Sequence, residues 1–267
     1  MSLYFDMRFL ALILLVAAVP LLAQDEPPDR VKLRFEPQSG QILHTRTSES
    51  HRIPAADGKA IDAEVTTAFT ARFDEVTSRD QFNADVVIEE LTGSMTRDAA
   101  VARIPELETP IVGRHFKATY GRLSEVQSIT VPQGAERMQA EVKNIITRRT
   151  PVPMFETLFI DEPVTLSSQI TLLPGIYAHL DVTTTLKSIE QDGPDYVGKM
   201  EIKWTGSVSS GPAGPSATTI KGNGTAEWNI NHSFLRAFSG ESRSEDSSEV
   251  IFHLRMTAFL DGTEPPR

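Results

Sequence analysis

The sequence contains no cysteine. This absence excludes disulfide bonds, thiolate metal sites, cysteine nucleophiles and lipid attachment to a cysteine at a processing junction. A chain without disulfides depends on its hydrophobic core for stability. Only one apolar run is long, and it lies at the very start, so no later segment is expected to span a membrane.

Sequence motifs of common enzymes are also absent. There is no Gly-x-Ser-x-Gly elbow, phosphate-binding loop, dinucleotide fingerprint or His-Glu-x-x-His pair. None of the six histidines lies two to four residues from another; they are His44, His51, His115, His179, His232 and His253. We therefore predict a protein that is not an enzyme, with no catalytic residue, no metal and no cofactor.

Positive charge is scarce: 26 lysines and arginines face 36 acidic residues, which gives a formal net charge of −10. Such a surface repels phosphate backbones, so we expect no nucleic acid partner. A charge of this size also keeps an exported protein in solution.

What is present begins with a basic start at Met7-Arg8 and an apolar run from Phe9 to Leu22, closed by Ala23. This order describes a secretory signal peptide over residues 1–23, with Met1 or Met7 as alternative initiators. The run is too short for an ordinary transmembrane helix. We therefore expect an exported, soluble protein of the periplasm or the extracellular space.

The rest of the chain reads as one antiparallel β domain over residues 31–260, between a linker at 24–30 and a polar tail at 261–267. Apolar residues alternate with polar ones over long stretches, which is typical of half-buried strands. The clearest stretches are 61–73, 82–88, 164–172, 176–186, 196–208 and 250–260. Weaker strands are expected at 31–36, 41–52, 115–120, 122–131, 217–230 and 233–238.

Three local features are interpreted further. Asn223-Gly224 is a hairpin signal, but alternation continues through it, so we favour one continuous strand there. Gly193-Pro194 is expected in a longer turn. Similar Thr- and Val-rich segments near Val65 and Val182 suggest an internal pseudo-repeat.

One helix is predicted over residues 133–148, opened by Pro132 and rich in helix-favouring residues. Its apolar face includes Met138, Val142 and Ile145, which we interpret as candidate lid residues.

The helix is too small to cover the predicted sheet. Eight strands as long as 61–73 would present an apolar face of about 1,500 Å², whereas a 16-residue helix covers about 240 Å². We therefore expect a strongly curved sheet, built as a half-barrel, a barrel or a sandwich, or one that leaves an internal space. Inward glycines at 198, 206, 222 and 224 suit either bent strands or tight cross-strand packing.

Several segments resemble a group of exported bacterial β-rich proteins whose domain has no known function: Leu33-Arg34-Phe35 with Gly40, the region of Gly121, and 224–239. A Gly-Asp/Ser-x-Trp segment associated with that group is replaced by Phe159–Pro163. The resemblance implies an exported β domain and no activity. By fold analogy alone, a curved sheet over one helix is also similar to LolA/LppX periplasmic carriers.

The functional hypothesis is therefore a non-catalytic cell-envelope protein that binds a lipid, an acyl chain or an envelope partner on a concave sheet face. Side chains that alternate inward are the candidate cavity lining, unless they only pack against each other. They are Phe69, Phe73, Phe82, Val86, Leu180, Leu186, Met200, Trp204, Trp228, Phe252 and Met256. The alternatives are an interaction module that uses sheet edges, and a hydrolase whose His, carboxylate and hydroxyl come together from distant positions.

Overall fold

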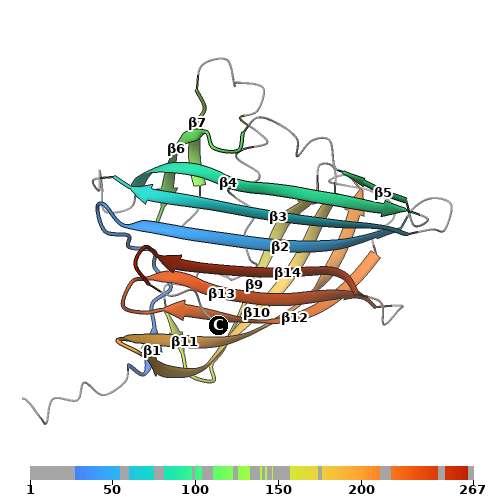
Figure 1. Ribbon diagram of the computed structural model, residues 1–267. Coiled ribbons are helices and arrows are strands. Elements are labelled where there is room, and N and C mark those ends of the chain that lie inside the picture. Colours follow the sequence, from blue (N-terminus) through green and yellow to red (C-terminus); the bar gives the residue numbers. More distant parts are fainter. Residues whose placement is uncertain are drawn as a thin grey trace, which may run out of the picture.

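The computed structural model describes residues 28–54, 60–74, 81–97, 100–103, 111–122, 126–132, 139, 142, 146, 157–173, 176–210, 218–245 and 250–263. These residues form fourteen strands (Figure 1). The strands are β1 (Arg30–Val31), β2 (Ile42–Pro54), β3 (Ala60–Phe73), β4 (Gln81–Arg97), β5 (Ala100–Arg103), β6 (His115–Gly121), β7 (Val126–Thr130), β8 (Leu158–Phe159), β9 (Pro163–Leu173), β10 (Ile176–Asp192), β11 (Asp195–Ser210), β12 (Thr218–Asn229), β13 (Phe234–Ser244) and β14 (Val250–Leu260).

Twelve of the strands form one antiparallel sheet. Its order is β7-β6-β4-β3-β2-β14-β13-β12-β11-β10-β9, with β5 paired to β4 outside this path. The end strands β7 and β9 do not pair with each other in the described part of the chain, so the sheet is not a closed barrel and that alternative was wrong. Strands β2, β3, β4 and β14 run nearly side by side, whereas β9 and β10 cross the view steeply (Figure 1).

The strands predicted from alternation are confirmed, and β12 continues through Asn223-Gly224 as favoured. Two predictions need correction. Gly193-Pro194 is a tight connection, because Asp192 pairs directly with Asp195, and its glycine has φ 63°. Glycine at the first of two loop residues fits a type II′ hairpin turn. The strand expected at 31–36 is reduced to β1, which pairs only with β8.

The predicted helix lies mostly outside the described residues. Gln139, Val142 and Ile146 are described and have helical backbone conformation, but no bounded helix lies in the described part. Val142 and Ile146 are buried, and the Gln139 side chain donates a hydrogen bond to the Ile129 carbonyl at 2.8 Å. The helix over 133–148 stays a prediction.

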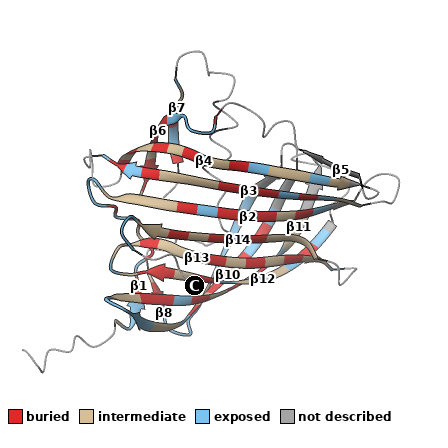
Figure 2. Cartoon of the chain, viewed as in Figure 1, coloured by how far each residue is buried: buried red, intermediate tan, exposed pale blue. Residues whose placement is uncertain are grey.

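The buried face of the sheet carries two apolar clusters, and Figure 2 shows buried positions recurring along the strands. Cluster 1 lies mainly on β3, β4, β6 and β7, with Val142 and Ile146, and it extends to Phe234 of β13 and Ala258 of β14. Cluster 2 lies on β10 to β14. We call the face that carries both clusters the inner face.

An extended segment near the N-terminus, residues 31–35, links the two clusters; we call it the strap. Val31 and Leu33 are fully buried in cluster 2, and Phe35 belongs to cluster 1. The Phe35 amide donates to the Arg122 carbonyl at 2.9 Å, and its ring lies edge-on to Phe73 at 5.3 Å. The sequence alternates as for a strand, but these residues cross the inner face and do not extend the sheet.

Val31 of the strap packs against Gly198 of β11, and this contact gives a first prediction. A Cβ at this glycine would lie 2.7 Å from Val31 Cγ2 but 3.7 Å from Val31 Cβ. We expect Gly198→Ala to lower the free energy of unfolding by about 1–2 kcal/mol through overpacking. In a Val31→Ala background the same change should cost almost nothing. Urea denaturation of the four proteins measures this coupling, and equal costs in both backgrounds would contradict the strap contact.

Candidate functional site

The predicted cavity residues are divided between the two clusters. Phe73, Phe82 and Val86 belong to cluster 1, and half-buried Phe69 packs against it. Cluster 2 contains Leu180, Leu186, Met200, Trp204, Trp228 and Met256, with half-buried Phe252 against it. Of the lid candidates, Val142 is buried in cluster 1, while Met138 and Ile145 lie outside the described residues. The role of these residues as a cavity lining stays a prediction.

Strand β2 breaks the apolar character of the inner face. Its inward positions are Thr45, Thr47, Glu49 and His51, all less than 9% exposed. β2 pairs with β3 on one side and β14 on the other, so this polar row runs through the middle of the sheet. Most of cluster 1 lies on its β3 side, and the sheet residues of cluster 2 lie on its β14 side. Sequence reasoning did not find the row.

Glu49 and His51 form a buried hydrogen-bonded pair within this row. His51 Nε2 lies 3.1 Å from Glu49 Oε2, and the two side chains are 5% and 6% exposed. The Phe252 ring of β14 lies 5.0 Å from the imidazole. A buried pair of this kind is strongly destabilised when one partner is removed, but it adds little net stability when intact. Net stability therefore does not account for its presence.

The inner face next to this pair is formed by glycines and one indole. In the strand register, Trp204, Gly222, Ser242, Phe252 and His51 follow each other across β11, β12, β13, β14 and β2. The Trp204 Nε1–H donates to Ser242 Oγ at 2.7 Å. A Cβ on Gly222 would overlap the indole itself. Gly222 thus serves tight packing of Trp204, one of the two alternatives from the sequence, whereas a Cβ on Gly206 or Gly224 would meet the backbone of the neighbouring strand.

We call Glu49, His51, Phe252, Ser242 and Trp204 the polar band. Two further buried polar atoms on the sheet have no hydrogen-bond partner among the described residues: Thr184 Oγ1 and Trp228 Nε1. Buried polar groups are normally paired, so such atoms call for an explanation. Together the band and these atoms give an otherwise apolar face several hydrogen-bonding groups.

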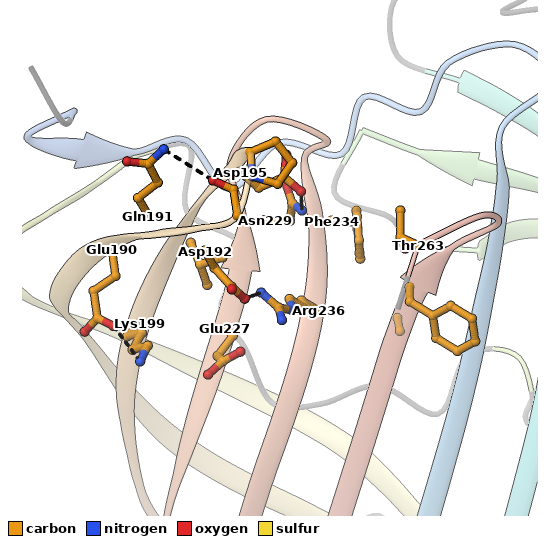
Figure 3. Close-up of a pocket in the computed structure, with 15 residues that line it drawn as sticks. Glu190, Gln191, Asp192, Asp195, Lys199, Glu227, Asn229, Phe234, Arg236 and Thr263 are labelled. Atoms are coloured by element: carbon orange, nitrogen blue, oxygen red, sulfur yellow. Dashed lines mark hydrogen bonds and ion pairs between the residues drawn. The ribbon is translucent and has the colours of Figure 1, made fainter. Parts of the chain in front are cut away.

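A separate pocket of about 710 Å³ lies at the β10–β11 turn (Figure 3). It is lined by polar residues of β10 to β13, with Phe234, Ala258 and Phe259 on one side. None of the predicted cavity residues lines it. It is therefore a second candidate site, distinct in character from the inner face.

Most charges in this pocket are already paired, as Figure 3 shows for two of the pairs. Lys199 Nζ lies 2.7 Å from Glu190, and Arg236 pairs with Asp192. The hydrogen bond from Lys199, with a smaller one from Ser188, holds the pKa of Glu190 below its usual value. The same bond raises the pKa of Lys199. Exposed pairs of this type contribute little stability. Here they connect β10 with β11 and with β13.

A histidine, a hydroxyl and a carboxylate do meet on the outer face. His44 Nδ1 lies 3.1 Å from Thr70 Oγ1, and its Nε2 lies 3.4 Å from Asp261. The Thr70 hydroxyl, however, donates its proton to Glu89. His44 is then the donor to Thr70, which is the reverse of a base that activates a nucleophile. This network does not favour the hydrolase alternative.

Within the described residues, no group of three or more metal-ligating side chains is placed to hold a metal ion. No helix in the same residues is long and apolar enough to cross a bilayer.

The comparison with known proteins finds similar solved structures but no related family. No family model and no curated protein matches the chain. Two solved structures are similar: a "putative exported protein with YmcC-like fold" from Bacteroides fragilis (10% identity, TM-score 0.27, covering 84% of this chain and 97% of that one) and a "putative lipoprotein" from Parabacteroides distasonis (11% identity, TM-score 0.33, covering 88% and 100%). Likenesses with TM-scores this low do not identify a function for the chain.

Proposed function

We propose that this chain is an exported, non-catalytic binding protein that holds an acyl lipid with an uncharged headgroup on its inner sheet face. One observation carries the proposal: a row of buried hydrogen-bonding groups that includes Glu49 and His51 lies on a face that otherwise carries two large apolar clusters. An amphipathic ligand has the matching composition, with a polar head and apolar chains.

The size of the sheet supports an enclosed interior. Eleven neighbouring strands at about 4.8 Å spacing make a layer about 50 Å wide, and strands of about 11 residues make it about 36 Å long. A five-residue strap is about 17 Å long and covers roughly a tenth of that area. Four more described residues outside the large sheet are buried with the clusters, namely Ile111, Val142, Ile146 and Leu158. Together with the strap, these described residues cover only part of the inner face. We therefore propose that the sheet curves around its own interior.

The charges of the inner face indicate the headgroup class. Among the described residues, Glu49 is the one buried carboxylate, and no lysine or arginine is buried. His51 is already paired with Glu49, so an anionic headgroup would add a buried charge without a described cation for it. Hydroxyl or ester groups can bond Thr184 Oγ1, Trp228 Nε1 and the polar band without this penalty.

The two tryptophans give a direct test, because both are buried in cluster 2. We expect a brominated monoacylglycerol to quench their fluorescence saturably, whereas the unbrominated lipid should not. Trp204→Phe and Trp228→Phe would show which indole the chain contacts. A folded protein whose emission is unchanged by the brominated lipid would refute binding at this face.

The same assay tests the headgroup. The brominated free fatty acid should bind at least about tenfold more weakly than the glycerol ester, because an unpaired buried charge costs more than about 1.4 kcal/mol. Equal affinities would retain the acyl-lipid function and reject the proposed headgroup class.

An interaction module remains the second candidate function. It is favoured by apolar side chains that stay exposed beside the edge strand β9, namely Phe159, Ile160 and Leu166.

A further inference from the structure

Strand β9 forms one end of the sheet. It pairs with β10 from Pro163 to Leu173, and the described residues place no strand on its other side. The opposite end strand, β7, has only five residues. An eleven-residue edge leaves a long row of backbone N–H and C=O groups available for pairing.

This edge lacks the usual protection. Its sequence, PVTLSSQITLL, contains no lysine, arginine, aspartate or glutamate. Each of the other strands of eleven or more residues carries at least one. Monomeric proteins commonly place charges on exposed edges to prevent pairing between molecules. β9 is thus both the one long edge strand and the one long strand without a charged residue in the described part of the chain. Pro163, its first residue, is the only residue of β9 that would hinder backbone pairing with another strand.

Exposed apolar side chains are concentrated along the same edge. Leu166 is 44% exposed, Phe159 39% and Ile160 41%. These are three of the five large apolar side chains that are exposed in the described part of the chain. Ile160 forms a parallel bridge with Leu186 of β10, next to the point where Pro163 pairs with Thr185, so it lies beside the N-terminal end of β9.

We propose that β9 is a homodimer interface, in which it pairs antiparallel with β9 of a second copy across a two-fold axis. A neutral strand is suited to self-pairing, because two chains of net charge −10 meet there without like charges in contact. The two-fold axis makes the contact isologous, so each Leu166 joins the apolar face of the partner sheet.

The expected dimer is weak. A paired strand of eleven residues is about 36 Å long and about 10 Å wide, so each copy buries roughly 360 Å² plus the flanking Phe159 and Ile160. This area is below the roughly 800 Å² per partner of a stable complex, so the association is weak. We expect a dissociation constant in the micromolar range.

Sedimentation equilibrium of the purified chain from low to high micromolar concentration tests the interface. We expect a reversible monomer–dimer equilibrium for the wild type, and a dimer dissociation constant raised at least about tenfold by either Leu166→Lys or Leu166→Glu. Ser128→Lys on the opposite edge, also exposed, should dimerise as the wild type does.

Tryptophan emission and the urea midpoint would confirm that each variant is folded, which exposed Leu166 should permit. A wild type that is monomeric throughout this range overturns the proposal. So does a Leu166→Lys protein that dimerises with the affinity of the wild type.

Discussion

Replacing His51 with leucine is expected to lower the free energy of unfolding by about 3 kcal/mol. The change removes the imidazole at 3.1 Å from the Glu49 carboxylate, which is only 6% exposed. A carboxylate is charged at neutral pH, so it must then lose this charge partner inside the protein. Glu49→Leu should cost less, because it leaves an imidazole rather than a carboxylate without its partner, and a buried carboxylate is the costlier group to leave unpaired. Urea denaturation monitored by tryptophan fluorescence gives both values.

The double variant Glu49→Leu/His51→Leu separates stability from function. Replacing a buried ion pair by apolar residues of similar size is often neutral or stabilising, so we expect unfolding within about 1 kcal/mol of the wild type. The same protein should bind the glycerol ester more weakly, because the headgroup loses two hydrogen-bonding partners on the inner face. A double variant as unstable as His51→Leu would contradict the view that the pair adds little net stability.

Gly222→Ala is expected to be the other severe change, with a loss of about 3 kcal/mol. The new Cβ would overlap the Trp204 ring on one side and the Glu241 carbonyl oxygen on the other. Neither atom set can move freely: Trp204 is also held by Ser242 through its Nε1–H, and the carbonyl belongs to the backbone of β13. Overpacking of this kind costs about 1–3 kcal/mol, and the indole would also lose its hydrogen bond.

Two measurements accompany this prediction. The tryptophan emission of Gly222→Ala should shift to longer wavelength as Trp204 leaves its site. Gly262→Ala is the control, because nothing lies within 4 Å of its added Cβ and its cost comes from φ 79° alone, about 1 kcal/mol. Its emission should be unchanged. An unshifted Gly222→Ala spectrum would show that the indole does not lie on this glycine.

The strands could be predicted because apolar and polar residues alternate over long stretches of the sequence. From Ile61 to Phe73 the inward positions are mostly small or apolar, and β3 has the expected bounds within one residue. Cross-strand partners were not predictable in the same way. The pairing of β14 with β2 joins residues about 200 positions apart, and no local pattern encodes it.

The burial of the polar row could not be predicted from the sequence for the same reason. Thr45, Thr47, Glu49 and His51 alternate as a strand, but a polar alternating face normally lies in solvent. It is buried here because β2 lies in the middle of the sheet, which only the strand order reveals. A Glu-x-His spacing on a strand places both side chains on one face, and this signal could have identified the pair. The Trp204 site depends equally on Gly222 and Gly240 of two different strands.

The pairing of β14 with β2 also sets when this protein can fold. The first and last long strands meet at the centre of the sheet, so the two halves are joined only after residues 250–260 are available. Contacts this distant in sequence form slowly, and a nascent chain cannot make them before residues 250–260 have been synthesised. The export proposed above requires a chain that is still unfolded during transit. The pairing of β14 with β2 meets this requirement, because the centre of the sheet cannot form until β14 is present.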